Sequence, residues 1–341
     1  MLYKTLFFLI VFNFLNTNFQ LIAQNSEQPN EVKWVSFKEA QELNKKQAKP
    51  FLIDIYTDWC GWCKHMDKTT YSNPGLANYI NTYFYAVKFD AETKDTIVYN
   101  GEKYWNTGTE KKSPHQLAIK LLSGKLSYPS TIFVNNNFQF NLLSQGYLDV
   151  KKIEPLLIYT VENVFRSTPY DSFSAKFEKT FYDTTKNEFE PKWLSINEAL
   201  SKQKTEPKKI IVFTNANFCN SCRVMKKTVL GDSTISKYLD KNYYLVDLNA
   251  EYKDDVTFNE QTYKVGQVAN FPFHPVTLAL TRNNLVFPSI SIIGEKQELL
   301  DVIPFYLNED ITLPVLQFYG DNHFKTTKWE DFLKSFRTPK K

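Results

Sequence analysis

Residues 51–64 read FLIDIYTDWCGWCK, an apolar run followed directly by two cysteines that are two residues apart. The run Phe51–Tyr56 is short enough for a buried strand, and the polar stretch after Cys63 predicts a helix. Cys60 then lies in the first turn of that helix, where unpaired backbone N–H groups and the helix dipole lower the pKa of a thiol. Cys63, one turn along, can attack a mixed disulfide and release a partner. The segment predicts a redox-active cysteine pair.

The same arrangement recurs 159 positions later, because Cys219 and Cys222 stand at 60 + 159 and 63 + 159. The apolar run Ile210–Thr214 precedes this second pair, whose motif reads CNSC. The offset holds along the chain without a gap, and it also pairs Trp34 with Trp193, Tyr79 with Tyr238, His115 with His274, Pro129 with Pro288 and Phe173 with Phe332. Two tandem copies of one domain are the economical interpretation.

Composition agrees with two globular domains. A chain of 341 residues suggests about two domains, and 43% hydrophobic with 23% charged residues is a globular composition. The net charge of +4 is too mild to indicate nucleic-acid binding. Four cysteines are too few for a disulfide-stapled scaffold. We expect a first domain at 25–182, a charged, polar linker at 183–190 and a second domain at 191–341.

Each copy has the pattern of an α/β domain. Capping-box motifs at Ser36–Glu39 and Ser195–Glu198 predict a helix start before each strand that leads to a cysteine pair. Further strands are expected at 84–89 and 243–248, a helix at 117–122, a hairpin with strands at 131–134 and 138–143, a closing helix at 152–165, and short terminal helices after Thr168 and Thr327.

The N-terminus has the features of a secretory signal peptide. Lys4 is the only charge before Glu27, and Leu6–Leu15 is a near-continuous apolar run. This run is shorter than the roughly 20 residues that a membrane-spanning helix needs. We expect residues 1–24 to be removed and the protein to be exported to the periplasm, with an uncleaved membrane anchor as the alternative.

The motifs resemble those of the thioredoxin family. Asp58–Lys64, with Asp54 six residues before the first cysteine, is similar to that family's active-site segment, and Tyr128–Thr131 is similar to its cis-proline loop. The likeness is to exported thioredoxin-like proteins of the kind found in Bacteroidetes and to the thioredoxin-like domain of periplasmic thiol–disulfide interchange proteins. It implies two tandem thioredoxin-fold domains, each with a central mixed sheet flanked by helices.

The resemblance also implies roles for single residues. Cys60 is expected to be the nucleophile and Cys63 the resolving thiol. Asp54 is expected to be a buried proton acceptor. Trp59 is expected to cover the pair, and Pro129 to be the substrate-side cis-proline, with Tyr128 beside it and Pro288 as its counterpart. Independently of the resemblance, Trp62 is a large aromatic side chain between the cysteines, so we expect it to be partly exposed on the substrate side.

The second copy departs from this pattern. Phe213 stands at the position of Asp54 and Phe218 at that of Trp59, while Cys219, Cys222 and Pro288 remain. Because phenylalanine cannot accept a proton, we expect Cys222 to resolve slowly and the first domain to be the principal active centre.

The expected function is thiol–disulfide oxidoreduction on protein cysteines, with an unidentified redox donor or acceptor as second partner. No metal or organic cofactor is required, because the cysteine pair itself carries the electrons. A client-binding, chaperone-like module with secondary cysteines is the alternative from another class. Structural disulfides and one shared four-cysteine zinc site are the non-catalytic interpretations. His115 and His274 are expected to be helix-start or core residues.

Overall fold

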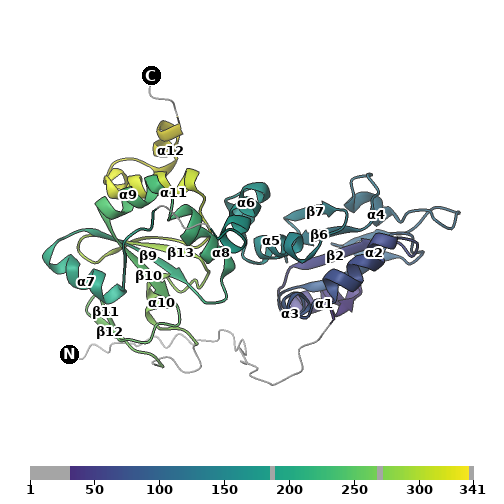
Figure 1. Cartoon of the computed structure of the whole chain (residues 1–341), viewed down its shortest axis with the longest axis horizontal. Coiled ribbons are helices and arrows are strands. Elements are labelled where there is room, and N and C mark those ends of the chain that lie inside the picture. Colours follow the sequence, from purple (N-terminus) through teal and green to yellow (C-terminus); the bar gives the residue numbers. More distant parts are fainter. Residues whose placement is uncertain (1–30, 185–188, 267–271, 338–341) are drawn as a thin grey trace, which may run out of the picture.

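The computed structural model describes residues 31–184, 189–266 and 272–337 (Figure 1). The expected signal peptide at 1–24 lies outside these residues. Figure 1 shows two lobes side by side, each with a sheet and its covering helices. In the described ranges, no helix has the length and apolar character needed to cross a membrane.

Each lobe contains a central mixed sheet flanked by helices, as the resemblance implies, and each sheet has five strands. In the first, β1, β3 and β2 are parallel neighbours, and β6 and β7 continue the sheet antiparallel in the order β1-β3-β2-β6-β7. The second repeats this order as β8-β10-β9-β13-β14. The strands are β1 (Trp34–Val35), β2 (Phe51–Tyr56), β3 (Tyr85–Asp90), β6 (Ser130–Val134), β7 (Asn141–Gln145), β8 (Trp193–Leu194), β9 (Lys209–Asn215), β10 (Tyr243–Asn249), β13 (Ser289–Ile293) and β14 (Leu299–Ile303).

Central strands β2 and β9 are buried along almost their whole length, which is why their sequences are mostly apolar and do not alternate between apolar and polar residues. Two small hairpins lie apart from the main sheets. They pair β4 (Ile97–Tyr99) with β5 (Glu102–Tyr104) and β11 (Val256–Phe258) with β12 (Gln261–Tyr263).

The helices also recur in the same order. The first lobe has α1 (Phe37–Lys46), α2 (Gly61–Met66), α3 (Pro74–Tyr83), α4 (Gln116–Leu121), α5 (Val150–Val161) and α6 (Tyr170–Phe181). The second has α7 (Ile196–Thr205), α8 (Asn220–Val224), α9 (Ser233–Asn242), α10 (Val276–Leu280), α11 (Glu309–Gly320) and α12 (Trp329–Arg337). Ser36 and Ser195 cap α1 and α7, but only α7 has the full reciprocal capping box, with Glu198 accepting from the Ser195 amide at 2.7 Å.

Two predicted boundaries were wrong. The hairpin strand expected at 138–143 begins only at Asn141, because Phe138 adopts a left-handed φ of 61° and belongs to the turn. The closing helix expected at 152–165 ends at Val161, where Asn163 reverses the chain with a φ of 54°. Asparagine tolerates this left-handed conformation better than most residues.

Helix α6 connects the lobes through a shared apolar core. It packs against α5 of its own lobe and against α8 of the second (Figure 1). Phe173 on α6 is fully buried, and its ring lies edge-on to that of Tyr306 at 5.7 Å between centroids. An ion pair between Lys176 and Glu309 reinforces the junction. The end of the first lobe is therefore part of the core of the second.

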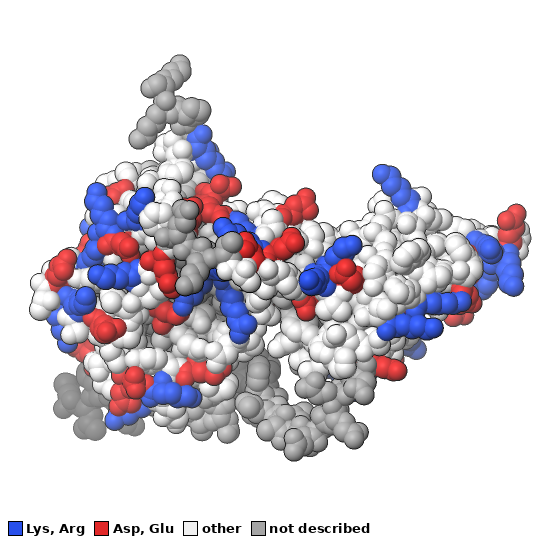
Figure 2. Space-filling view, in the orientation of Figure 1, with Lys and Arg blue, Asp and Glu red and all other residues white. Residues whose placement is uncertain are grey.

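Charged side chains are scattered over the visible face with both signs interspersed (Figure 2). This distribution agrees with the small net charge, and the visible face has no continuous basic patch.

Candidate functional site

Both cysteine pairs lie where a central strand meets a helix. Cys60 is the N-cap of α2 and Cys219 is the N-cap of α8, and each sulfur accepts the amide of the second cysteine at 3.1 Å. Each pair forms a disulfide, and all four residues are at least 95% buried. Local geometry alone therefore does not distinguish the two pairs.

The proline loops also recur. The Tyr128–Pro129 and Phe287–Pro288 bonds are both cis, the conformation that the resemblance implies for Pro129. Beside Pro129, the rings of Tyr128 and Trp59 meet edge-on at 6.1 Å, which brings the loop close to the residue before Cys60.

The surface around the first pair is aromatic. Trp59 and Trp62 expose 54% and 62% of their area, large fractions for tryptophan. The Trp59 indole donates to Glu92 Oε1 at 2.8 Å. Trp62, between the cysteines, lies against His65 and Tyr147, with centroids 5.6 Å away in both cases. An exposed aromatic surface therefore lies beside the first cysteine pair.

Asp54 is a buried carboxyl group on β2. Lys88 Nζ lies 2.6 Å from its Oδ2, and the Tyr71 hydroxyl donates to Oδ1 at 3.4 Å. Burial raises the pKa of Asp54, and the charge of Lys88 opposes this effect. Lys88 also pairs with Asp67, so the ammonium is shared between two carboxylates. A buried carboxyl group with a raised pKa is suited to proton exchange.

In the second domain, this polar cluster is replaced by an apolar one. Phe213, Leu230 and Ile290 occupy the positions of Asp54, Tyr71 and Thr131, and all three are buried. The second domain also has an ion pair that corresponds to the one between Lys88 and Asp67, but the two charges are exchanged. Lys226 stands at the position of Asp67, and Asp247 stands at the position of Lys88.

A carboxylate reaches the second pair from the other domain. Glu162, at the C-cap of α5, accepts the amides of Asn220 at 3.0 Å and Ser221 at 2.7 Å, and its Oε2 lies 3.6 Å from the Cys219 sulfur. Burial raises the pKa of Glu162 to about 7, against the opposing hydrogen bonds from Ser221 and Asn220. Sequence reasoning missed this residue, and its one signal was that the repeat aligns it with another acid, Asp321.

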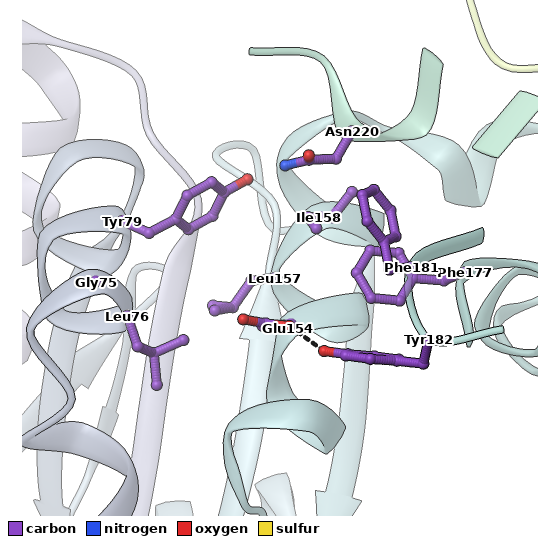
Figure 3. Close-up of a pocket in the computed structure, with 10 residues that line it drawn as sticks. All are labelled: Gly75, Leu76, Tyr79, Glu154, Leu157, Ile158, Phe177, Phe181, Tyr182 and Asn220. Carbon is purple, nitrogen blue, oxygen red and sulfur yellow. Dashed lines mark hydrogen bonds between the residues drawn. The ribbon is translucent and has the colours of Figure 1, made fainter. Parts of the chain in front are cut away.

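A cavity of about 430 Å³ lies at the same junction (Figure 3). Its walls come from α3, α5 and α6, and Asn220, between the second pair of cysteines, reaches its edge. Tyr79 faces Asn220 across the opening, while Tyr182 donates to Glu154 at 2.5 Å on the rim.

The histidines are structural, as expected. His115 caps α4 by accepting the Leu117 amide at 3.1 Å, and His274 accepts the Val276 amide at 3.2 Å. Burial lowers the pKa of both imidazoles. Over the described part of the chain, no group of three or more His, Cys, Asp or Glu side chains is arranged to hold a metal.

Two family models match the chain. Residues 15–154 match Thioredox_DsbH, described as a protein of unknown function, DUF255, and residues 192–292 match a thioredoxin-like family. One match falls on each lobe, so the chain has two thioredoxin-like regions, as the sequence resemblance implies.

Curated and solved proteins are similar over shorter or more divergent stretches. The thiol:disulfide interchange protein DsbD of Yersinia enterocolitica is 38% identical over 53 residues, which are 14% of this chain and 9% of that protein. DsbD of Vibrio vulnificus is 38% identical over 56 residues, 15% of this chain and again 9% of the relative. A thioredoxin-fold protein from Helicobacter pylori is 20% identical, covering 47% of this chain and 88% of its own, with a TM-score of 0.31.

Proposed function

We propose that this protein is a thiol–disulfide oxidoreductase acting on protein cysteines, with Cys60–Cys63 as the principal active centre. The observation that carries the proposal is the setting of this pair. A disulfide caps a helix directly after a buried strand, a buried carboxyl group lies on that strand, and exposed aromatic rings flank the motif.

In the reducing direction, the Cys60 thiolate attacks a partner disulfide and forms a mixed disulfide, releasing one partner thiolate. Cys63 then loses its proton to Asp54 and attacks the Cys60 sulfur, which expels the second partner thiolate. Two electrons pass to the partner, and the pair ends as a disulfide. Oxidation of a dithiol partner follows the same steps in reverse. The direction is set by the potential of the unidentified redox donor or acceptor.

Two observations support the primacy of the first domain. Phe213 replaces the proposed proton acceptor in the second domain, and Glu162 occupies the amides that begin α8. A partner chain approaching Cys219 meets α5 and α6 of the first domain, whereas Trp62 is open to solvent.

Export and domain limits belong to the same proposal. A protein with residues 1–24 removed would work outside the cytoplasm as domains at 25–182 and 191–341, without a membrane segment, nucleic acid or bound cofactor. N-terminal sequencing of native protein is expected to begin near Gln24 or Asn25, and a sequence that begins at Met1 would contradict export.

Trapping tests the enzymatic proposal. Cys63→Ser leaves the nucleophile but no resolving thiol, so mixed disulfides with exported proteins should accumulate, and they should disappear on reduction. Cys60→Ser is the matched control and should trap none. Insulin reduction should fall to the level of the second pair alone in both variants. A Cys63→Ser protein that binds clients without a covalent link would instead favour the client-binding module.

A further inference from the structure

The Glu162 carboxylate joins the two domains at the second cysteine pair. It accepts two consecutive amides of the CNSC motif, from Asn220 and Ser221, and lies beside the Cys219 sulfur. These are the N–H groups that would otherwise stabilise a Cys219 thiolate at the start of α8. In the described part of the first domain, no side chain accepts from the corresponding amides of Gly61 and Trp62.

The repeat provides an internal comparison for this contact. Asp321 stands at the position of Glu162, and Tyr238 at that of Tyr79. In the second domain the Tyr238 hydroxyl donates to Asp321 at 2.9 Å, so acid and tyrosine stay within one domain. The Glu162 side chain, which is one methylene longer than that of Asp321, instead accepts the Asn220 and Ser221 amides of the neighbouring domain. The interdomain contact is therefore particular to Glu162 and is not a general property of this helix end.

We infer that Glu162 is a positioning residue of the first domain that holds the second cysteine pair in its disulfide form. The carboxylate occupies the amides that would bind a thiolate and places a negative charge next to it. Both effects disfavour the reduced state with ionised Cys219, whereas the uncharged disulfide is not penalised. The inference rests on the proposed thiol chemistry but not on any turnover.

The equilibrium concerned is a balanced exchange with glutathione. Two glutathione thiols supply two electrons and two protons, the Cys219–Cys222 bond breaks, and one glutathione disulfide forms. At pH 8 Glu162 is ionised, since its pKa is about 7. Its other titratable or charged neighbours are Arg223 on α8 and Tyr79 and Tyr83 on α3. Burial raises the pKa of both tyrosines, so they remain neutral at this pH.

The test is Glu162→Gln in the full-length protein. Cys60 and Cys63 are both changed to serine, so that only the second cysteine pair contributes to the measured disulfide fraction. At pH 8 the fraction of Cys219–Cys222 disulfide is measured by mass spectrometry across glutathione ratios. The glutamine variant should be easier to reduce by about tenfold in the equilibrium constant, which is about 30 mV for a two-electron couple. The pH midpoint for alkylation of Cys219 should fall by about one unit or more.

Asp321→Asn is the matched control, because it removes the equivalent carboxylate without touching a cysteine, and both values should stay at those of the parent. A second measurement needs no variant at Glu162: in the reduced natural protein, the alkylation midpoint of Cys219 should lie above that of Cys60. An unchanged equilibrium, or a midpoint that rises in Glu162→Gln, would overturn the inference. The proposed function is tested by a different experiment, and it is contradicted if Cys63→Ser does not trap partner proteins.

Discussion

The two cysteine pairs share their local geometry and differ in what surrounds them. Each begins a helix after a buried strand, and each is followed along the chain by a cis-proline loop. Around Cys60–Cys63 lie a buried carboxyl group, its lysine partner and an open aromatic surface. Around Cys219–Cys222 lie apolar side chains and, from the other domain, Glu162 and α6. The proposed difference in reactivity therefore rests on the neighbours of the motif as well as on the motif.

The exchange of charges shows how such a change is accommodated. Lys88 forms ion pairs with both Asp54 and Asp67 in the first domain. Where Phe213 replaces Asp54, a lysine at the position of Lys88 would have lost a carboxylate partner in the interior. The second domain carries Asp247 there and Lys226 opposite it, and the pair lies at the edge of the core. A buried charge without a partner is costly, so the polar cluster is expected to change as a unit.

The largest expected effect comes from the helix that both domains use. Phe173→Ala removes a fully buried ring that packs against Tyr306 of the second domain, and should lower the free energy of unfolding by about 3–5 kcal/mol. Phe332→Ala, at the equivalent position on α12, should cost less, because Phe332 is 8% exposed and its ring packs against Phe318 and Trp329 of its own domain. Urea unfolding measures both, and equal losses would contradict the role given to α6.

Removing the buried carboxyl group should have the next largest effect. Asp54→Asn keeps the shape of the side chain but cannot accept the Cys63 proton, so resolution of the mixed disulfide should slow by about 10²-fold. Stopped-flow kinetics in a background without Cys219 and Cys222 isolates the first pair. Asp67→Asn, which loses a contact to the same Lys88, is the control and should change the rate far less. Similar slowing in both variants would indicate that Lys88 is the group that matters.

The titration of the Glu162 carboxyl group should be detectable in the pH dependence of the free energy of unfolding. Its pKa is raised from 4.5 to about 7 in the folded protein, so the native state holds a proton that the unfolded chain releases earlier. The associated stability is fully present below pH 4.5 and is lost as the pH rises through 7, by at most about 1.4 kcal/mol per pH unit. Glu162→Gln should flatten this part of the profile, and Asp321→Asn should leave it in place. An unaltered slope in Glu162→Gln would assign the titration to another group.

The smallest effect is expected at the exposed surface. Trp62→Ala removes an aromatic contact that Ser221 cannot provide in the second domain, and should raise KM for a protein substrate about two- to tenfold with kcat little changed. Ile119→Ala removes an exposed apolar side chain from α4 and is the control. A fall in kcat alone would place Trp62 in the chemistry of the pair, instead of in partner binding.

Much of this protein follows from its sequence, because the relevant forces act between near neighbours. Buried strands appear as apolar runs, and Ser36 and Ser195 mark the starts of two helices. The constant offset of 159 positions shows that the chain contains two tandem copies of one domain. The cysteine spacing places both sulfurs in one helical turn. The replacement of Asp54 by Phe213 already predicts that the two pairs differ.

Tertiary structure alone decided how the second pair is controlled. Glu162 is 57 positions from Cys219 and belongs to another domain, so no periodicity or motif links them. Their contact depends on how α6 packs between the lobes, where the burial of Phe173 and Phe177 sets the orientation. Apolar packing is not directional and its partners are not encoded by spacing. For that reason the sequence predicts that the second pair lacks Asp54, and only the folded chain shows which carboxylate lies beside Cys219.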